Sequence, residues 1–139
     1  MISTKGRYAI RVVIDIAEQD KGTRVPLGDV AERQAMSEKY LQRIAKSLVE
    51  AGLLVGVGGR GGGYALARPA KSISVFEVIR AAEGSLASVA CLEKGAEPCE
   101  RAQNCKALRL WRGLDKMTRS YLEGVTVADL VDTNTAEAD

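Results

Sequence analysis

The chain has 139 residues, of which 46% are hydrophobic and only 4% aromatic. This length fits one domain with an appendage, or two very small units that share a core. An apolar stretch at 10–16 is interrupted by Arg11 and Asp15, unlike a signal peptide or a spanning helix of about 18 residues. We therefore expect a soluble, cytoplasmic protein.

Charge is distributed unevenly along the chain, although the formal net charge is only +2. Residues 1–70 carry 11 Lys or Arg against 7 Asp or Glu, whereas residues 71–139 carry 9 against 11. The first half is the better candidate to bind a polyanion, but a solvated surface explains the asymmetry almost as well. The chain has no histidine, which excludes Ser-His-Asp and Cys-His catalysis.

Three helices are predicted in the first half of the chain. Thr4 can cap a helix over 4–19, in which Ile10, Val13, Ile14 and Ala17 form one apolar stripe. A turn at 20–25 leads to Pro26, which opens a short helix. Its predicted buried face consists of Leu27, Val30 and Ala31.

Ser37 is predicted to cap a third helix, and Gly52 to end it. The apolar face of this helix consists of Leu41, Ile44, Ala45, Leu48 and Val49. Two short apolar runs, 53–57 and 64–67, then flank a glycine-rich loop, which predicts a β-hairpin. Three helices followed by a hairpin indicate a winged helix-turn-helix, whose third helix enters the DNA major groove.

The exposed face of the third helix suits DNA recognition. Arg43 can pair bidentately with guanine and Gln42 with adenine, and Lys46 is better placed to contact phosphate. A Lys, Arg and Gln face is also typical of an ordinary solvated helix, so the order of the elements is needed to support the prediction. The polar face as a whole consists of Lys39, Tyr40, Gln42, Arg43, Lys46 and Ser47.

The tip of the hairpin carries Arg60 among five glycines. Glycines let the backbone approach a groove closely, and a lone arginine can enter a narrow minor groove. The alternative is a flexible turn with an incidental arginine. Residues 56–61 also match G-x-G-x-x-G, but a strand follows rather than a helix, which excludes a nucleotide site and argues against an enzyme.

The second half is predicted to contain three more helices. A capping box, Ser74 to Glu77, begins a helix that Gly84 ends and that buries Val75, Val78, Ile79 and Ala82. A loop over 85–104 leads to a long helix ending near residue 123, and a short helix runs from about 126 to 130 before a polar tail. Apolar or aromatic positions recur along the long helix at Leu108, Trp111, Leu114, Thr118, Tyr121 and Leu122.

The three cysteines, Cys91, Cys99 and Cys105, lie within fifteen residues. Thiolates are soft ligands, and a loop rich in Gly and Pro can wrap an iron–sulfur cluster. The absence of a C-x2-4-C pair counts against a structural zinc site. Alternatives are redox-active thiols without metal, or no role for the cysteines. A fourth ligand must come from elsewhere, with nearby candidates at Glu93, Glu97 and Glu100.

Four segments together resemble signatures of the Rrf-two family of bacterial winged-helix regulators: 3–9, 37–41, 60–64 and 99–112. The resemblance covers nearly the whole chain and implies a homodimer held by the long helix, bound to a two-fold-related operator in double-stranded DNA. It also implies a cluster on the three cysteines, of the 2Fe-2S type in the cluster-binding branch. The DNA-binding set that follows is Ser37, Lys39, Tyr40, Gln42, Arg43, Lys46, Gly59 and Arg60.

The sequence departs from the family pattern at its possible ligands. Where the cluster-binding branch has a histidine, three positions after the last cysteine, this chain has Leu108. Arg7 stands where nitric-oxide-sensing relatives supply an aspartate ligand. The fourth ligand is therefore unassigned. Other relatives respond to cysteine supply through an enzyme partner, so a regulator controlled by a protein partner is a further alternative.

The expected architecture is mainly α with a small β-hairpin wing. Residues 1–70 are predicted to form the DNA-binding domain, and residues 71–139 the cysteine-loop sensor and dimerisation region. We expect gain or loss of a cluster to reorder the loop and so change the spacing or tilt of the two recognition helices in a dimer.

Overall fold

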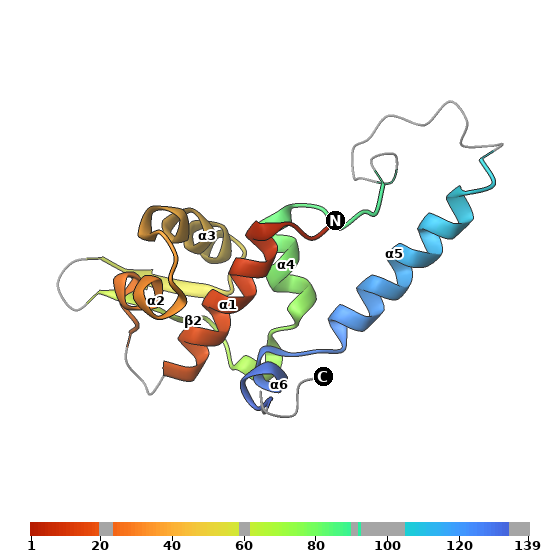
Figure 1. Cartoon of the computed structure of the whole chain (residues 1–139). Coiled ribbons are helices and arrows are strands. Elements are labelled where there is room, and N and C mark those ends of the chain that lie inside the picture. Colours follow the sequence, from red (N-terminus) through yellow and green to blue (C-terminus); the bar gives the residue numbers. More distant parts are fainter. Residues whose placement is uncertain (20–23, 59–61, 90–91, 93–104, 134–139) are drawn as a thin grey trace.

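A computed structural model describes residues 1–19, 24–58, 62–89, 92 and 105–133. The described part is mainly helical with one antiparallel hairpin, which confirms the predicted fold class (Figure 1). Its elements are α1 (Thr4–Gln19), α2 (Leu27–Gln34), α3 (Glu38–Glu50), β1 (Leu54–Val57), β2 (Gly63–Leu66), a 3-10 turn η1 (Ala70–Ser72), α4 (Val75–Glu83), α5 (Leu108–Glu123) and α6 (Val127–Val131).

Helix α1 lies at the centre of the fold and packs against α2, α3, α4, α6 and β2 (Figure 1). Because it has neighbours on several sides, its buried face is wider than one stripe and is centred on Ala9, Val12, Val13 and Ile16. Of the predicted stripe only Val13 is buried; the other three residues, Ile10, Ile14 and Ala17, are half-buried. Asp15 is also buried, at 4% exposed.

The start of α1 is held by α4 rather than by a local side chain alone. Thr4, the predicted cap, is the first residue of the helix, and Ser3 precedes it. The Glu83 carboxylate accepts hydrogen bonds from the Ser3 hydroxyl (2.7 Å), the Ser3 amide (2.7 Å) and the Gly6 amide (2.8 Å). A Cβ at Gly6 would lie 2.5 Å from that carboxylate, so any larger residue there would displace the Glu83 side chain. Sequence periodicity could not reveal a cap supplied from so far along the chain.

Helices α2 and α3 form the helix-turn-helix. Leu27, Val30 and Ala31 are buried as predicted. Ala35 ends α2 in the left-handed conformation, with φ 53°, and Ser37 caps α3. Helix α3 buries four of its five predicted residues, whereas Val49 is 39% exposed, and Gly52 follows the helix with φ 75°. The turn chemistry predicted from the sequence is thus confirmed for α3.

The hairpin forms with β1 and β2 paired from Leu54–Leu66 to Val57–Gly63. Its strands differ from the predicted ranges by one residue at three of their four ends. Two backbone hydrogen bonds of 2.8 Å between Val25 and Tyr64 tie the hairpin to the segment before α2. Gly63 has φ 149° and a Cβ there would meet the Val25 backbone at 2.5 Å, so this close approach requires glycine.

The capping box predicted at Ser74–Glu77 is present, and a second box, Thr126–Asp129, begins α6. Helix α4 buries its predicted residues and also Phe76. Helix α5 begins at Leu108, later than predicted, because 105–107 form a turn. The core of α1–α3 continues through Ile73, Val78, Ala82 and Val127. Within the described ranges, no helix is both long and apolar enough to cross a membrane.

The pKa of Glu83 lies below its ordinary value of 4.5. Burial by itself would raise it, but the hydrogen bonds from Ser3 and Gly6 favour the ionised form more strongly. The ionised form of Glu83 is therefore more stable in the folded protein than in the unfolded chain. This contribution to stability is complete above the ordinary pKa and is lost as pH falls through the lower, folded-state pKa.

Glu83→Gln should lower the free energy of unfolding by about 1 kcal/mol at neutral pH, because a charge-assisted cap is lost. The deficit should shrink as pH falls below about 4.5, where the wild-type carboxylate also becomes protonated. Urea unfolding between pH 3 and 7 measures both effects. The exposed Glu18 on the same helix α1 supplies the control, Glu18→Gln. A deficit that does not change with pH would contradict the assignment.

Candidate nucleic-acid interface and cysteine segment

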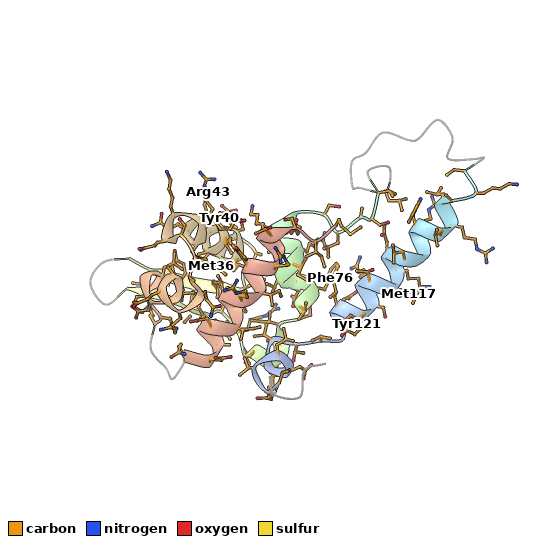
Figure 2. All side chains as sticks on the ribbon, viewed as in Figure 1. Met36, Tyr40, Arg43, Phe76, Met117 and Tyr121 are labelled. Carbon is orange, nitrogen blue, oxygen red and sulfur yellow. The ribbon has the colours of Figure 1, made fainter. Side chains whose placement is uncertain are left out.

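The outward face of α3 brings together four of the eight predicted DNA-binding residues. Lys39, Gln42, Arg43 and Lys46 are all exposed, on the side opposite the buried stripe. Figure 2 shows Arg43 on the outer side of α3 and Tyr40 nearer to α1. This face offers two lysines, a guanidinium and an amide to a ligand, which are donors suited to phosphate and to base edges.

Ser37 starts the recognition helix. Its hydroxyl accepts a hydrogen bond from the Tyr40 amide at 3.4 Å, and its own backbone is extended. The side chain is exposed at the positive end of the α3 dipole, a place that favours a phosphate oxygen.

Tyr40 is half-buried rather than free on the surface. Its ring lies edge-on to the Tyr8 ring of α1, with centroids 5.8 Å apart and planes at 80°. The Arg11 guanidinium lies 5.3 Å from the Tyr8 ring centroid. Sequence reasoning did not single out Tyr8 or Arg11 as partners of α3. Tyr8 and Arg11 are three residues apart, which places them on the same side of the first helix. This spacing was the signal in the sequence that could have paired them.

The base of the hairpin lies beside α3, with Lys46, Val49, Val57 and Tyr64 lining a shared hollow. The predicted wing residues Gly59 and Arg60 lie outside the described residues. Strands β1 and β2 lie beside the helix-turn-helix: β1 packs against α3, and β2 pairs with Val25, just before α2 (Figure 1).

Of the three cysteines, Cys91 and Cys99 lie outside the described residues, as do Glu93, Glu97 and Glu100. Cys105 is a half-buried free thiol, and its carbonyl accepts a hydrogen bond from Leu108 at the start of α5. Among the described residues, no group of three or more His, Cys, Asp or Glu could hold a metal ion. Cys105 fits a cluster by donor chemistry: its thiol is a soft ligand that is not enclosed by the core.

Helix α5 projects away from the rest of the fold (Figure 1). Leu122 is its one buried residue and joins Val75, Phe76 and Ile79 of α4. A second apolar stripe is open to solvent, with exposed fractions of 61% for Leu110, 42% for Leu114, 73% for Met117 and 72% for Tyr121. The predicted repeat contained Leu114 and Tyr121 but missed Leu110 and Met117, because two stripes overlap on this helix.

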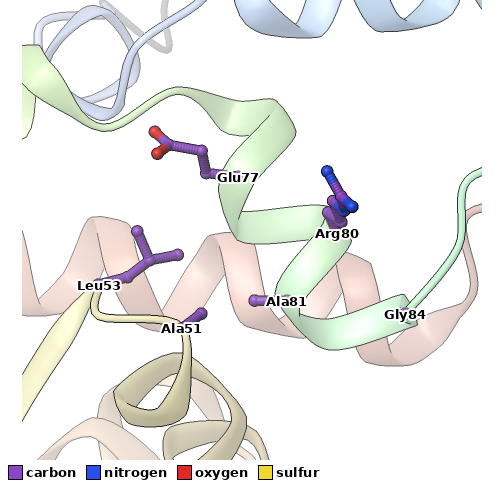
Figure 3. Close-up of a pocket in the computed structure, with 6 residues that line it drawn as sticks. All are labelled: Ala51, Leu53, Glu77, Arg80, Ala81 and Gly84. Atoms are coloured by element: carbon purple, nitrogen blue, oxygen red, sulfur yellow. The ribbon is translucent and has the colours of Figure 1, made fainter.

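A shallow hollow of about 300 Å³ lies between the end of α3 and α4, lined by Ala51, Leu53, Glu77, Arg80, Ala81 and Gly84 (Figure 3). Glu77 already binds Arg68 at 2.6 Å and the Ser74 amide at 2.9 Å. Burial alone would raise the pKa of Glu77, but the hydrogen bonds from Arg68 and Ser74 outweigh this effect and bring the pKa below its ordinary value. The ionised form of this carboxylate is therefore favoured, and its oxygens accept hydrogen bonds from Arg68 and from the Ser74 cap of α4.

The fold and the exposed face of α3 define a winged helix-turn-helix DNA-binding protein. The family model described as "Rrf2: Iron-dependent Transcriptional regulator" matches residues 2–133. The chain therefore belongs to the Rrf2 (Rrf-two) family of transcription regulators, as the resemblance predicted, and not to a family of enzymes.

Relatives and solved structures agree with this assignment. The chain is similar to "HTH-type transcriptional regulator IscR" of Yersinia enterocolitica, at 38% identity over 130 residues, 94% of this chain and 78% of the relative. It is also similar to the structure of T. potens IscR, with TM-score 0.74 and 32% identity, covering 100% and 92%. A third similar structure is CymR, the global cysteine regulator of B. subtilis, with TM-score 0.78 and 28% identity, covering 96% and 98%.

Proposed function

We propose that this transcription regulator reads an operator with α3 and adjusts its affinity through an iron–sulfur cluster on Cys91, Cys99 and Cys105. The observation that carries the first part is the continuous exposed face of Lys39, Gln42, Arg43 and Lys46 on a helix whose opposite face is buried. In this proposal residues 1–70 read DNA, and residues 71–139 sense and dimerise, in the cytoplasm.

Base recognition rests on the first turns of α3. Lys39, Gln42 and Arg43 reach base edges in the major groove, where Arg prefers guanine and Gln prefers adenine. Ser37 and Lys46 contact phosphates on either side, and Tyr40 contributes at the edge of the interface. Gly59 and Arg60 at the wing tip reach the neighbouring minor groove.

We infer that the exposed stripe of α5 is covered by α5 of a second copy. Leu110, Leu114, Met117 and Tyr121 recur at intervals of four, three and four, which places them along one side of the helix. Gly113 beside them has nothing within 4 Å of a hypothetical Cβ, which leaves room for a close helix crossing. A symmetric dimer presents two recognition helices to a two-fold-related operator.

The three thiolates supply the soft donors that a cluster of the 2Fe-2S type requires, and a fourth donor is to be found among Glu93, Glu97 and Glu100. When bound, the cluster would cross-link the three cysteines, and its presence would depend on iron supply and on oxidants. Cys105 is joined by the turn at Leu108 to the dimer helix, and the loop containing Cys91 and Cys99 connects α4 to α5. A cluster that orders this segment can change DNA affinity only if it binds more tightly to one arrangement of the recognition helices than to the other.

A metal-free thiol sensor is the second candidate. Two observations favour it: Leu108 replaces the histidine of the cluster-binding branch, and the chain is similar to a structure of Staphylococcus aureus CymR in an oxidised form, with TM-score 0.74 and 31% identity, covering 96% and 98%. In that case the cysteines would change DNA affinity by oxidation, or a protein partner would do so.

Arg43→Ala and Lys46→Ala should affect DNA binding differently. The reference is a duplex that the wild-type protein selects from a random pool. At one base pair of this duplex, Arg43→Ala should reduce the discrimination between the preferred base and the others by about 1–3 kcal/mol. Lys46→Ala should weaken binding to every sequence and reduce the slope of log affinity against log salt by about one per subunit. Lys71→Ala, on η1, is the control. Wild-type behaviour in both variants would contradict the assignment of α3.

The cluster is tested on protein purified without oxygen, by its visible absorbance and by iron and sulfide assays. We expect charge-transfer bands, with iron and sulfide in equal amounts, that are lost in Cys→Ala variants at 91, 99 and 105. Separate Glu→Gln changes at 93, 97 and 100 should identify the fourth ligand. A colourless protein that resists reconstitution would support the metal-free thiol sensor. In that case peroxide treatment should change the affinity for DNA.

Met117→Glu should convert the dimer to monomer, because two carboxylates would be buried at the crossing of the α5 helices. Arg112→Glu is the matched control, since it introduces the same side chain on the opposite side of α5. Analytical ultracentrifugation distinguishes the two species. A wild-type protein that is monomeric at micromolar concentration, or a dimer that withstands Met117→Glu, would contradict the predicted interface.

A further inference from the structure

The recognition helix is held from the side by an aromatic contact with α1. Tyr40 lies in the first turn of α3, directly after Lys39 and shortly before Gln42 and Arg43. Its ring meets the Tyr8 ring edge-on, 5.8 Å between centroids. Such pairs contribute about 0.5–1.5 kcal/mol beyond the area they bury, and their geometry is specific. The contact therefore restricts both the position and the roll of the first turn of α3.

Arg11 connects this aromatic pair to the turn between α2 and α3. Its guanidinium lies 5.3 Å from the Tyr8 ring centroid. It also donates to the Gln34 carbonyl at 2.6 Å and to the Gln34 side-chain oxygen at 3.1 Å. One side chain thus holds the Tyr8 ring and satisfies a carbonyl at the end of α2.

The end of α2 is itself tied to α1 by the buried Asp15. Arg33 donates to both oxygens of Asp15, at distances between 2.7 and 3.2 Å, and the Gln34 amide donates to it at 2.9 Å. Because Asp15 is 4% exposed, this cluster has little freedom to rearrange. Tyr8, Arg11 and Asp15 therefore present one side of α1 to both helices of the helix-turn-helix.

We propose that Tyr8 and Arg11 are positioning residues for base recognition, which set the orientation of α3 through Tyr40 and Gln34. The inference rests on the proposed reading of DNA by α3. Hydrogen bonds to base edges require donor–acceptor distances near 2.7–3.2 Å, so a small rotation of α3 breaks them. Contacts between mobile lysines and phosphates tolerate the same rotation, since they depend mainly on charge.

The test compares affinity for a duplex selected by the wild-type protein with affinity for calf thymus DNA. Tyr8→Leu, which keeps an apolar side chain without the ring, should reduce the ratio of these affinities roughly tenfold or more. Affinity for calf thymus DNA and its salt dependence should remain within a factor of about two of wild type. Tyr8→Phe, which keeps the ring, should restore the ratio. Arg11→Gln should also lower the ratio without flattening the salt dependence.

Val127→Ala is the matched control, since it removes buried volume from the same core at α6, away from α3. It should lower the thermal midpoint and leave the affinity ratio unchanged. An unchanged ratio in Tyr8→Leu would overturn the inference. So would a loss in Tyr8→Phe equal to that in Tyr8→Leu, or a flatter salt dependence in Arg11→Gln, because these results identify direct DNA contacts. A wild-type protein that selects no sequence would overturn the proposed function as well.

Discussion

The rest of the structure depends on the central position of α1 and on the charge buried within it. Asp15 is the one buried charged side chain among the described residues. A buried carboxylate is costly unless it is paired and hydrogen-bonded, and within the described part of the chain Arg33 and Gln34, at the end of α2, are the partners of Asp15. These hydrogen bonds fix the end of α2 against α1, and apolar packing of α1 against α2, α3 and α4 completes the core.

The same helix joins the two halves of the molecule. At its N-terminus, Glu83 from the end of α4 binds Ser3 and Gly6. In the sequence, Cys91 and Cys99 fall between α4 and α5, and Cys105 precedes the first residue of α5 by three positions. Helix α1 therefore contacts the end of α4 at its own N-terminus and the end of α2 further along, through Glu83 and Gln34 respectively.

The two ends of the fold have opposite surface chemistry. The outward side of α3 is polar and basic and needs no further protein to stabilise it, whereas α5 exposes Leu110, Met117 and Tyr121 beyond the folded body. Water exposure of a continuous apolar stripe is unfavourable, and burying it against a second copy relieves that cost. The proposed dimer would carry two such basic faces, related by two-fold symmetry, as a two-fold operator requires.

Local signals in the sequence predicted the helices, the hairpin and the ends of α3 and α4: Ser37, the Ser74–Glu77 box and Gly52 act within one turn, where side chain and backbone are neighbours regardless of the fold. The resemblance of four segments to family signatures predicted the family, and the residue types of the third helix predicted its polar face. Tertiary structure decided which side of α1 is buried, that Glu83 caps α1, that Tyr40 packs on Tyr8, and that α5 leaves Leu110 and Met117 uncovered. Those contacts join residues distant in the sequence, and periodicity within one helix does not specify its neighbours.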